Sequence, residues 1–339
     1  MKELLKDLCM LNGVSGDESA VREYIAEKVR DKCEMSVDNL GNLICFCPGR
    51  KKASKKLMIC AHMDEVGFIV TYIREDGALC FGEVGGIDPS VILGRQVTVG
   101  KNHINGVVGS TAVHNLSKEQ REQPPKTDDM YIDIGADSRE EAEKHIRLGD
   151  PVYFSSDFVQ LGERCVKSKA IDDRAGCAMM IRLIREKPEY DTYFVFNVQE
   201  EIGLRGSRVS TFSVAPDFAI VLEATTAADI DGISGQKRVC ALGNGPVVGF
   251  MDRSTVYDKE LYRLAFETAN ELDIPCQTKT MIAGGNDSGA IHLSGKGVRT
   301  IAVSVPCRYL HSPSCVIDTA DLENSLKLVR ALSKRVHEL

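Results

Sequence analysis

Lys169-Ala170-Ile171-Asp172-Asp173-Arg174-Ala175-Gly176 is the stretch around which the rest of the chain is arranged. Two adjacent carboxylates stand directly before residues 175–185, a run with helical periodicity. An acid in this position ordinarily caps the helix, because its oxygen accepts hydrogen bonds from the first free backbone N–H groups. One aspartate would fill that role. The pair therefore indicates either a doubled cap followed by a solvated arginine, or a cap and a carboxylate that serves a site.

Composition excludes several classes of function. The chain has 339 residues and a formal net charge of −7, which argues against a nucleic-acid partner and against docking on an anionic membrane. No apolar run approaches the roughly 20 residues of a spanning helix, and residues 1–7 lack the apolar core of a signal peptide. The 12 cysteines form no CxxC pair, so reduced thiols are expected. We expect a cytoplasmic protein without nucleic-acid or membrane partners.

The hydrophobic pattern changes twice along the chain. Residues 1–66 and 165–339 combine apolar strand-like runs with helical runs, which is typical of an α/β domain. Between residues 67 and 164 the runs are short, alternate with period two and are separated by Gly or Asp clusters, with little helix. Such spacing favours a small β-barrel or sandwich. The sequence therefore predicts a discontinuous α/β domain, residues 1–66 and 165–339, with a β domain of residues 67–164 inserted into it.

Acids and histidines follow the strands that this α/β domain should contain. In open α/β sheets, ligands bind outside the carboxyl ends of the strands. The predicted strands end at, or lead to, the following residues: His62 after 56–61, Glu200 and Glu201 after 192–198, Glu223 after 217–222, and His311 beyond 299–305. Asp172 and Asp173 fall at the same end, because they begin a helix. These side chains are therefore expected to meet at one edge of the sheet.

The mixture of ligand types predicts a particular kind of metal site. Histidine with carboxylate suits zinc, cobalt or manganese better than calcium or magnesium. There are too many acids for one tetrahedral ion, whereas a carboxylate that bridges two ions would use them. Taken singly, each residue has an ordinary explanation: a strand-end or loop histidine, a solvated acid, or acids that compensate a helix dipole. Their joint occurrence at strand ends favours the metal hypothesis.

The pattern resembles the co-catalytic zinc aminopeptidases, and nearly the whole chain resembles the M42 family of glutamyl and leucyl aminopeptidases, which form tetrahedral particles. The motifs that carry the resemblance are His62-x-Asp64, Asp172-Asp173, Glu200-Glu201-Ile202-Gly203, Glu223, Gly284-Gly285-Asn286-Asp287-Ser288-Gly289 and Arg308-Tyr309-Leu310-His311. The resemblance implies a mixed sheet sandwiched by helices, with the inserted domain as a small β-barrel that mediates dimerisation.

The resemblance also implies a role for each matching residue. His62 and Glu223 would hold one metal ion, Glu201 and His311 would hold the other, and Asp172 would bridge the two. Asp64 would orient the ring of His62 and fix its tautomer. Glu200, which holds no metal, would be the general base.

Two details of the family pattern bear on this chain. The family often has an aspartate where this chain has Glu223, whose longer side chain can still reach a metal ion. The pattern further implies a cis peptide bond between Asp172 and Asp173.

The function implied is a metal-dependent aminopeptidase with two divalent ions per subunit, zinc with cobalt or manganese as alternatives. Its substrates would be peptides with a free N-terminus, and its chains would associate into a homodimer or a dodecamer. A glycoside hydrolase is the alternative enzyme, but Glu200 and Glu201 are adjacent whereas catalytic carboxylates must flank a bond, and the chain has no Trp. A third possibility is an inactive peptide-binding scaffold. A preference for glutamyl substrates would need a basic pocket, for which Arg253, Arg308 and Lys237 are candidates.

Overall fold

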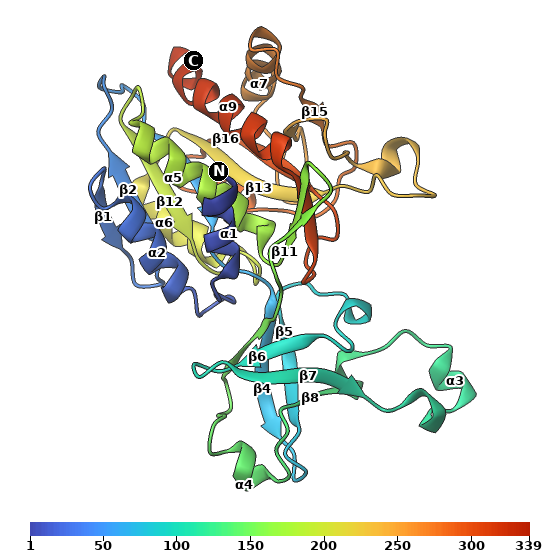
Figure 1. The fold of residues 1–339 in the computed structure, drawn as a ribbon. Coiled ribbons are helices and arrows are strands. Elements are labelled where there is room, and N and C mark those ends of the chain that lie inside the picture. Colours follow the sequence, from blue (N-terminus) through green and yellow to red (C-terminus); the bar gives the residue numbers. More distant parts are fainter.

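The computed structural model describes residues 1–339, apart from the side chain of Gln120. Figure 1 shows two bodies joined through a narrow region: an α/β part that contains both termini and a smaller β part that carries one long excursion. No helix among the described residues combines the length and the apolar character that crossing a membrane requires.

The α/β part is built on an eight-stranded mixed sheet. Its strands, in spatial order, are β1 (Glu34–Val37), β2 (Leu43–Cys47), β12 (Thr192–Asn197), β3 (Leu57–His62), β13 (Phe218–Thr226), β16 (Arg299–Cys307), β14 (Val247–Val248) and β15 (Gln277–Thr278). The four central strands, β12, β3, β13 and β16, are parallel to one another. Their residues are almost all buried, as strands covered on both faces should be.

Helices cover both faces of this sheet. Helix α5 (Ile171–Glu186) packs on β3 and β13, and α9 (Thr319–Arg335) packs on β16. Helix α6 (Arg205–Val214) packs on β12. The connection β3–α5–β12 runs toward the β1 edge of the sheet, whereas β12–α6–β13 runs toward the β15 edge. Because such crossovers are right-handed, α5 and α6 lie on opposite faces. The predicted helix-sandwiched mixed sheet is confirmed.

The remaining elements of the α/β part are short or peripheral. They are α1 (Lys2–Met10), α2 (Ser19–Val29), α7 (Lys259–Glu271), α8 (Ser288–Ile291), and a small antiparallel sheet of β10 (Val159–Leu161), β11 (Cys165–Ser168) and β17 (Cys315–Asp318). Helices α1 and α2 pack on α5, and α7 packs on α9.

The inserted part is a closed six-stranded barrel, so the predicted barrel is confirmed. Its strands, in order around the barrel, are β4 (Gly67–Ile73), β5 (Leu79–Val84), β8 (Met130–Asp133), β7 (Ile104–Ser110), β6 (Gln96–Val99) and β9 (Pro151–Phe154). Phe68 makes edge-to-face contacts with Phe81 and Phe154 inside it. The excursion seen in Figure 1 contains α3 (Lys118–Arg121), and α4 (Arg139–Ala142) precedes β9. The domain limits 1–66, 67–164 and 165–339 stay a prediction; β10 pairs with β11 and not with the barrel.

Candidate metal centre

The carboxyl ends of the central strands bring the predicted side chains together. His62 is the last residue of β3 and pairs in register with Asn197 of β12, two residues before the turn that carries Glu200. Glu223 lies on β13, two residues beyond Val221, which pairs with Cys60 of β3. His311 follows β16, and Asp172 lies at the start of α5, directly after Ile171. Each side chain thus reaches the site from its own element, at the sheet edge where the sequence predicted it.

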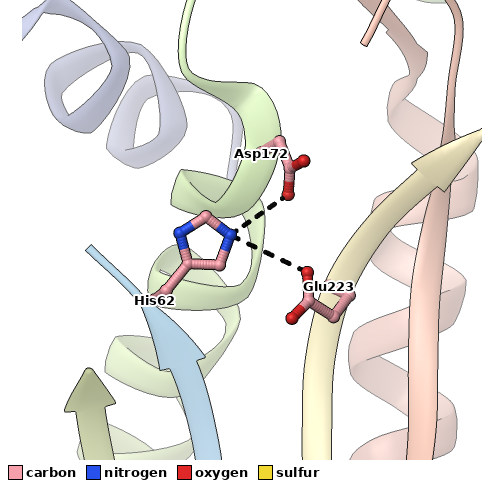
Figure 2. A group of neighbouring side chains, drawn as sticks. All are labelled: His62, Asp172 and Glu223. Atoms are coloured by element: carbon pink, nitrogen blue, oxygen red, sulfur yellow. Dashed lines mark ion pairs between the residues drawn. The ribbon is translucent and has the colours of Figure 1, made fainter. Parts of the chain in front are cut away.

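The first group of side chains is buried and centred on His62. Its Nε2 atom lies 3.4 Å from Oδ1 of Asp172 and 3.8 Å from Oε2 of Glu223. Figure 2 shows the two carboxylates converging on this nitrogen from α5 and β13. The other ring nitrogen, Nδ1, lies 3.0 Å from the backbone carbonyl of Asp64. A carbonyl only accepts hydrogen bonds, so Nδ1 carries a hydrogen and Nε2 is the nitrogen that faces the two carboxylates.

The second group is centred on His311. Its Nε2 atom lies 3.5 Å from Oδ2 of Asp172 and 3.4 Å from Oε2 of Glu201. Its Nδ1 atom lies 2.7 Å from the carbonyl oxygen of Gly86. The two oxygens of Asp172 therefore face two different histidines, Oδ1 toward His62 and Oδ2 toward His311.

These groups fit a cation. In each group the candidate ligand atoms lie within 4.8 Å of one another, and a third set links His62 with Glu200 and Glu201. Oδ1 of Asp172 and Oε1 of Glu223 are buried without a hydrogen-bond partner. Buried carboxylates without partners are costly unless a positive charge compensates them. The donor set of imidazole and carboxylate is one that zinc, cobalt and manganese accept.

The electrostatics of the acids lead to the same conclusion. Burial raises the pKa of Glu201 to about 7, with His311 opposing the shift and Asp172 adding to it. Burial also raises the pKa of Glu200 well above its ordinary value, because the neighbouring Glu201 adds to the effect and His62 only partly offsets it. A divalent cation would reverse such shifts, because it is the largest local charge in its site.

The two aspartates of the opening stretch have different tasks. Asp173 accepts a hydrogen bond from the backbone N–H of Gly176 at 2.9 Å, as a helix cap does. Asp172 faces the histidines instead. Both residues depart from helical backbone angles, and the peptide bond between them is cis, as the family resemblance implied. Arg174 is fully buried, so the alternative of a doubled cap followed by a solvated arginine is wrong.

Asp64 has more partners than the sequence indicated. Its carboxylate accepts hydrogen bonds from the backbone N–H groups of Glu200 and Glu201, at 3.0 and 3.1 Å, and from the hydroxyl of Ser15 at 2.6 Å. The same carboxylate lies 3.4 Å from Nδ1 of His62, farther than the backbone carbonyl. Asp64 is thus placed to hold the Glu200–Glu201 turn as well as the histidine ring.

A cavity of about 570 Å³ opens beside the two groups. His62, Asp172, Glu200, Glu201, Glu223 and His311 all line it. Arg253, Arg308 and Lys237 do not; Arg308 pairs with Asp229 at 2.7 Å instead. Among the described residues that line the cavity, Lys279 is the only lysine or arginine. No sequence motif surrounds Lys279. It reaches the cavity wall because it directly follows edge strand β15.

The model of one peptidase family, M42 glutamyl aminopeptidase, matches residues 41–328. This chain is a member of the M42 family. Among the curated M42-like relatives, a putative aminopeptidase of Acetivibrio thermocellus is 41% identical over 97% of both chains. The lysyl aminopeptidase of Pyrococcus furiosus is 35% identical over 97% of this chain and 96% of its own. The glutamyl aminopeptidase of Lactococcus lactis subsp. cremoris is 30% identical over 97% and 94%.

Solved structures agree with the family. The TET aminopeptidase of Thaumarchaeota archaeon SCGC AB-539-E09 superposes with a TM-score of 0.95 at 34% identity, over 98% of this chain and 96% of its own. The TET1 peptidase of Pyrococcus horikoshii, described as assembling into a tetrahedron or a large octahedral shell, gives 0.86 at 32% identity over 98% of both chains. A structure from Thermotoga maritima described as an endoglucanase gives 0.82 at 39% identity over 98% of both. The M42 family and this fold make the chain a hydrolase of the aminopeptidase class.

Proposed function

We propose that this M42 member removes N-terminal residues from peptides at a centre of two divalent cations. His62 and Glu223 would hold one cation, Glu201 and His311 the other, and Asp172 would be shared. The observation that carries the proposal is the placement of Asp172, whose two oxygens lie 3.4 Å from His62 and 3.5 Å from His311. A carboxylate between two imidazoles, each with its Nε2 turned to the centre, is suited to bridge two cations.

The cations would be zinc, with cobalt or manganese as alternatives. When bound, they would polarise the scissile carbonyl and lower the pKa of a bound water. Three ligand carboxylates would leave such a centre with about one unit of positive charge, which favours hydroxide at neutral pH.

Glu200 would be the general base. It lines the cavity, and the hydrogen bond from its backbone N–H to Asp64 fixes the start of its side chain. In this role its carboxylate accepts a proton from the attacking water and later donates it to the nitrogen of the leaving amine. Because it must be ionised to accept that proton, its function depends on the positive charge beside it.

Lys279 would contribute to the choice of the first side chain. Its ammonium group donates one hydrogen bond, to the carbonyl of Ala283 at 2.8 Å. Asp252, also in the cavity wall, is occupied by the N–H groups of Ser254 and Thr255 and by the hydroxyl of Tyr257. Lys279 therefore keeps positive charge in the wall, which favours an acidic side chain at the N-terminus of the peptide.

Self-association and a cytoplasmic location complete the proposal. The shells described for the TET1 relative support self-association of this chain. The assembly would be a dimer or a dodecamer, with contacts on the barrel. The endoglucanase description of one structural relative favours glycoside hydrolysis as the second candidate. The adjacent positions of Glu200 and Glu201 argue against that alternative, as does the lack of Trp, on which sugar rings commonly stack.

A substrate panel with metal analysis tests the proposed function. The purified protein should hydrolyse peptides with a free N-terminus, leave N-acetylated copies intact and lose activity on chelation. Elemental analysis should find two divalent ions per chain. Cleavage of cellulose oligomers without peptide hydrolysis would establish the glycosidase alternative, and a protein that binds no metal and cleaves neither class would be the scaffold.

A further inference from the structure

The barrel touches the candidate metal centre directly. Gly85 and Gly86 follow strand β5, and the carbonyl oxygen of Gly86 lies 2.7 Å from Nδ1 of His311. A Cβ atom placed on Gly85 would lie 3.3 Å from Cβ of Glu201 and 2.7 Å from a methyl group of Val66. The Gly85–Gly86 turn therefore contacts both side chains that we assign to the second cation.

The first cation position has no such dependence on the barrel. The Nδ1 atom of His62 is held by the carbonyl of Asp64, which lies in the α/β part. The two histidines also differ in exposure, since the His62 side chain is 1% exposed and that of His311 is 34% exposed. Burial fixes the first ring, whereas the second ring depends on the hydrogen bond that Gly86 accepts.

The Gly86 carbonyl belongs to the barrel. The next residue, Ile87, is buried in the hydrophobic core of the barrel, and strand β5 precedes the turn. On the other side, His311 has a positive φ of 56° and belongs to a loop outside the central strands. A second bond between the two bodies lies nearby, from the hydroxyl of Ser156 to the carbonyl of Pro313 at 2.6 Å. The position of the barrel thus decides how the His311 ring is presented.

We propose that the Gly85–Gly86 turn positions the second cation, between Asp172, Glu201 and His311, and leaves the first cation unaffected. The Gly86 carbonyl fixes the hydrogen on Nδ1 of His311 and so keeps Nε2 free to bind metal. Gly85 is the residue that allows the turn to approach Glu201 closely. The proposal rests on the two-cation centre described under Proposed function. It gives the inserted domain a role in building the active site that is separate from assembly.

A pair of glycine substitutions tests the proposal. Gly85 has a φ of +89° and its added Cβ would collide with Val66 and crowd Glu201, so Gly85→Ala should displace the turn. Gly94, also in the barrel, has a φ of +75° but nothing within 4 Å of its added Cβ. Gly94→Ala therefore imposes the same kind of backbone strain without touching the centre, and it is the matched control.

The measurement is a titration of the metal-free full chain with Zn²⁺, followed by calorimetry and by elemental analysis after dialysis. Wild type and Gly94→Ala should bind two ions per chain. Gly85→Ala should keep one ion at wild-type affinity and bind the other about 10–100-fold more weakly, the range usual for loss of a group that orients a metal ligand. Two unchanged affinities in Gly85→Ala, or equal loss of both ions, would overturn the proposal.

A second variant covers the case in which Gly85→Ala does not fold. Gly86 has no positive φ, and its added Cβ would lie 3.7 Å from Nδ1 of His311. Gly86→Val requires no left-handed backbone and places methyl groups near the ring, so it should weaken the second ion selectively. Two ions bound with unchanged affinity would again overturn the proposal. A wild type that binds fewer than two ions would instead refute the two-cation centre itself.

Discussion

At the scale of single residues, the aspartate pair shows how adjacent side chains of one type divide two tasks. Asp173 caps the helix through Gly176, and Asp172 faces His62 and His311. The backbone between them leaves the helical conformation, so their carboxylates point in different directions. Glu200 and Glu201 also have different contacts, since only Glu201 lies within ion-pair distance of His311.

Replacement of Glu200 separates catalysis from metal binding. Glu200→Gln should keep both metal ions, because Glu200 is not one of the assigned ligands. It should lower kcat by about 100-fold or more, because the amide cannot accept the proton of the attacking water. Stopped assays with aminoacyl-p-nitroanilides and elemental analysis of the same preparation check both expectations. Wild-type activity in this variant would exclude Glu200 as the base.

Replacement of Lys279 tests the choice of substrate. Lys279→Met should lower kcat/KM for N-terminal glutamyl substrates by about 10–100-fold, the worth of one hydrogen bond between charged groups. Leucyl substrates should be affected much less, since they cannot use the ammonium group. Lys237→Met is the matched control, because Lys237 is exposed and does not line the cavity. Equal losses for glutamyl and leucyl substrates would exclude a role for Lys279 in charge selection.

At the scale of elements, buried charges connect the N-terminal helix to the start of α5. Arg174 donates to the carbonyl of Leu8 at 2.6 Å, in the last turn of α1, and to the carbonyl of Met63 at 2.8 Å. It therefore gives a second donor to a helix-end carbonyl, which also accepts a hydrogen bond from the N–H of Leu11 at 3.2 Å. Lys169 pairs with Glu65 at 2.6 Å in the same buried region. Helix α1 is thus fixed against the segment that carries Asp172.

Loss of Arg174 should destabilise the fold. Arg174→Met removes the side-chain donor from the buried carbonyl of Met63 and one of the two donors from that of Leu8. We therefore expect the free energy of unfolding to fall by about 3 kcal/mol. Arg182→Met, on the same helix, removes an exposed arginine that lies 3.6 Å from Glu186. This substitution should change the free energy of unfolding by less than about 1 kcal/mol. Urea denaturation of both variants measures the difference. If the two substitutions lowered the free energy of unfolding by similar amounts, the buried arginine would stabilise the fold no more than the exposed one.

At the scale of the whole molecule, the barrel has two proposed roles. Its Gly86 carbonyl contacts His311 of the candidate centre, and its surface carries the proposed contacts between copies of the chain. Tyr153 of the barrel also donates a hydrogen bond to Asp17, and Asn12 is hydrogen-bonded to His103 at 3.1 Å. Several polar contacts therefore hold the barrel against the N-terminal loop of the α/β part.

Self-association is open to direct measurement. We expect the full chain, of 37.2 kDa, to show the mass of a dimer or a dodecamer in light scattering. Chemical cross-links between isotopically distinct copies should fall mainly within residues 67–164, because the barrel is proposed to mediate the contact. Cross-links confined to the α/β part would contradict that assignment, and a monomeric mass at micromolar concentration would contradict assembly.

The sequence by itself determined the fold class, the inserted β domain and the sheet edge at which the candidate residues meet. Periodicity identifies strands and helices, and parallel strands end at one edge, so acids and histidines that follow them must meet there. Position alone therefore named a set of candidates, and the family resemblance singled out His62, Asp172, Glu201, Glu223 and His311 as the ligands. Which aspartate caps the helix depends on backbone angles that no local pattern encodes.

Only the tertiary structure decided which distant groups touch these residues. The burial of Arg174, the Gly86 carbonyl on His311 and the entry of Lys279 into the cavity all join segments far apart in the sequence. Such contacts depend on how the two bodies and several loops pack against one another. The type and spacing of the residues do not indicate this packing. For the same reason the sequence offered Arg253, Arg308 and Lys237, none of which lines the cavity, and did not indicate Lys279, which does.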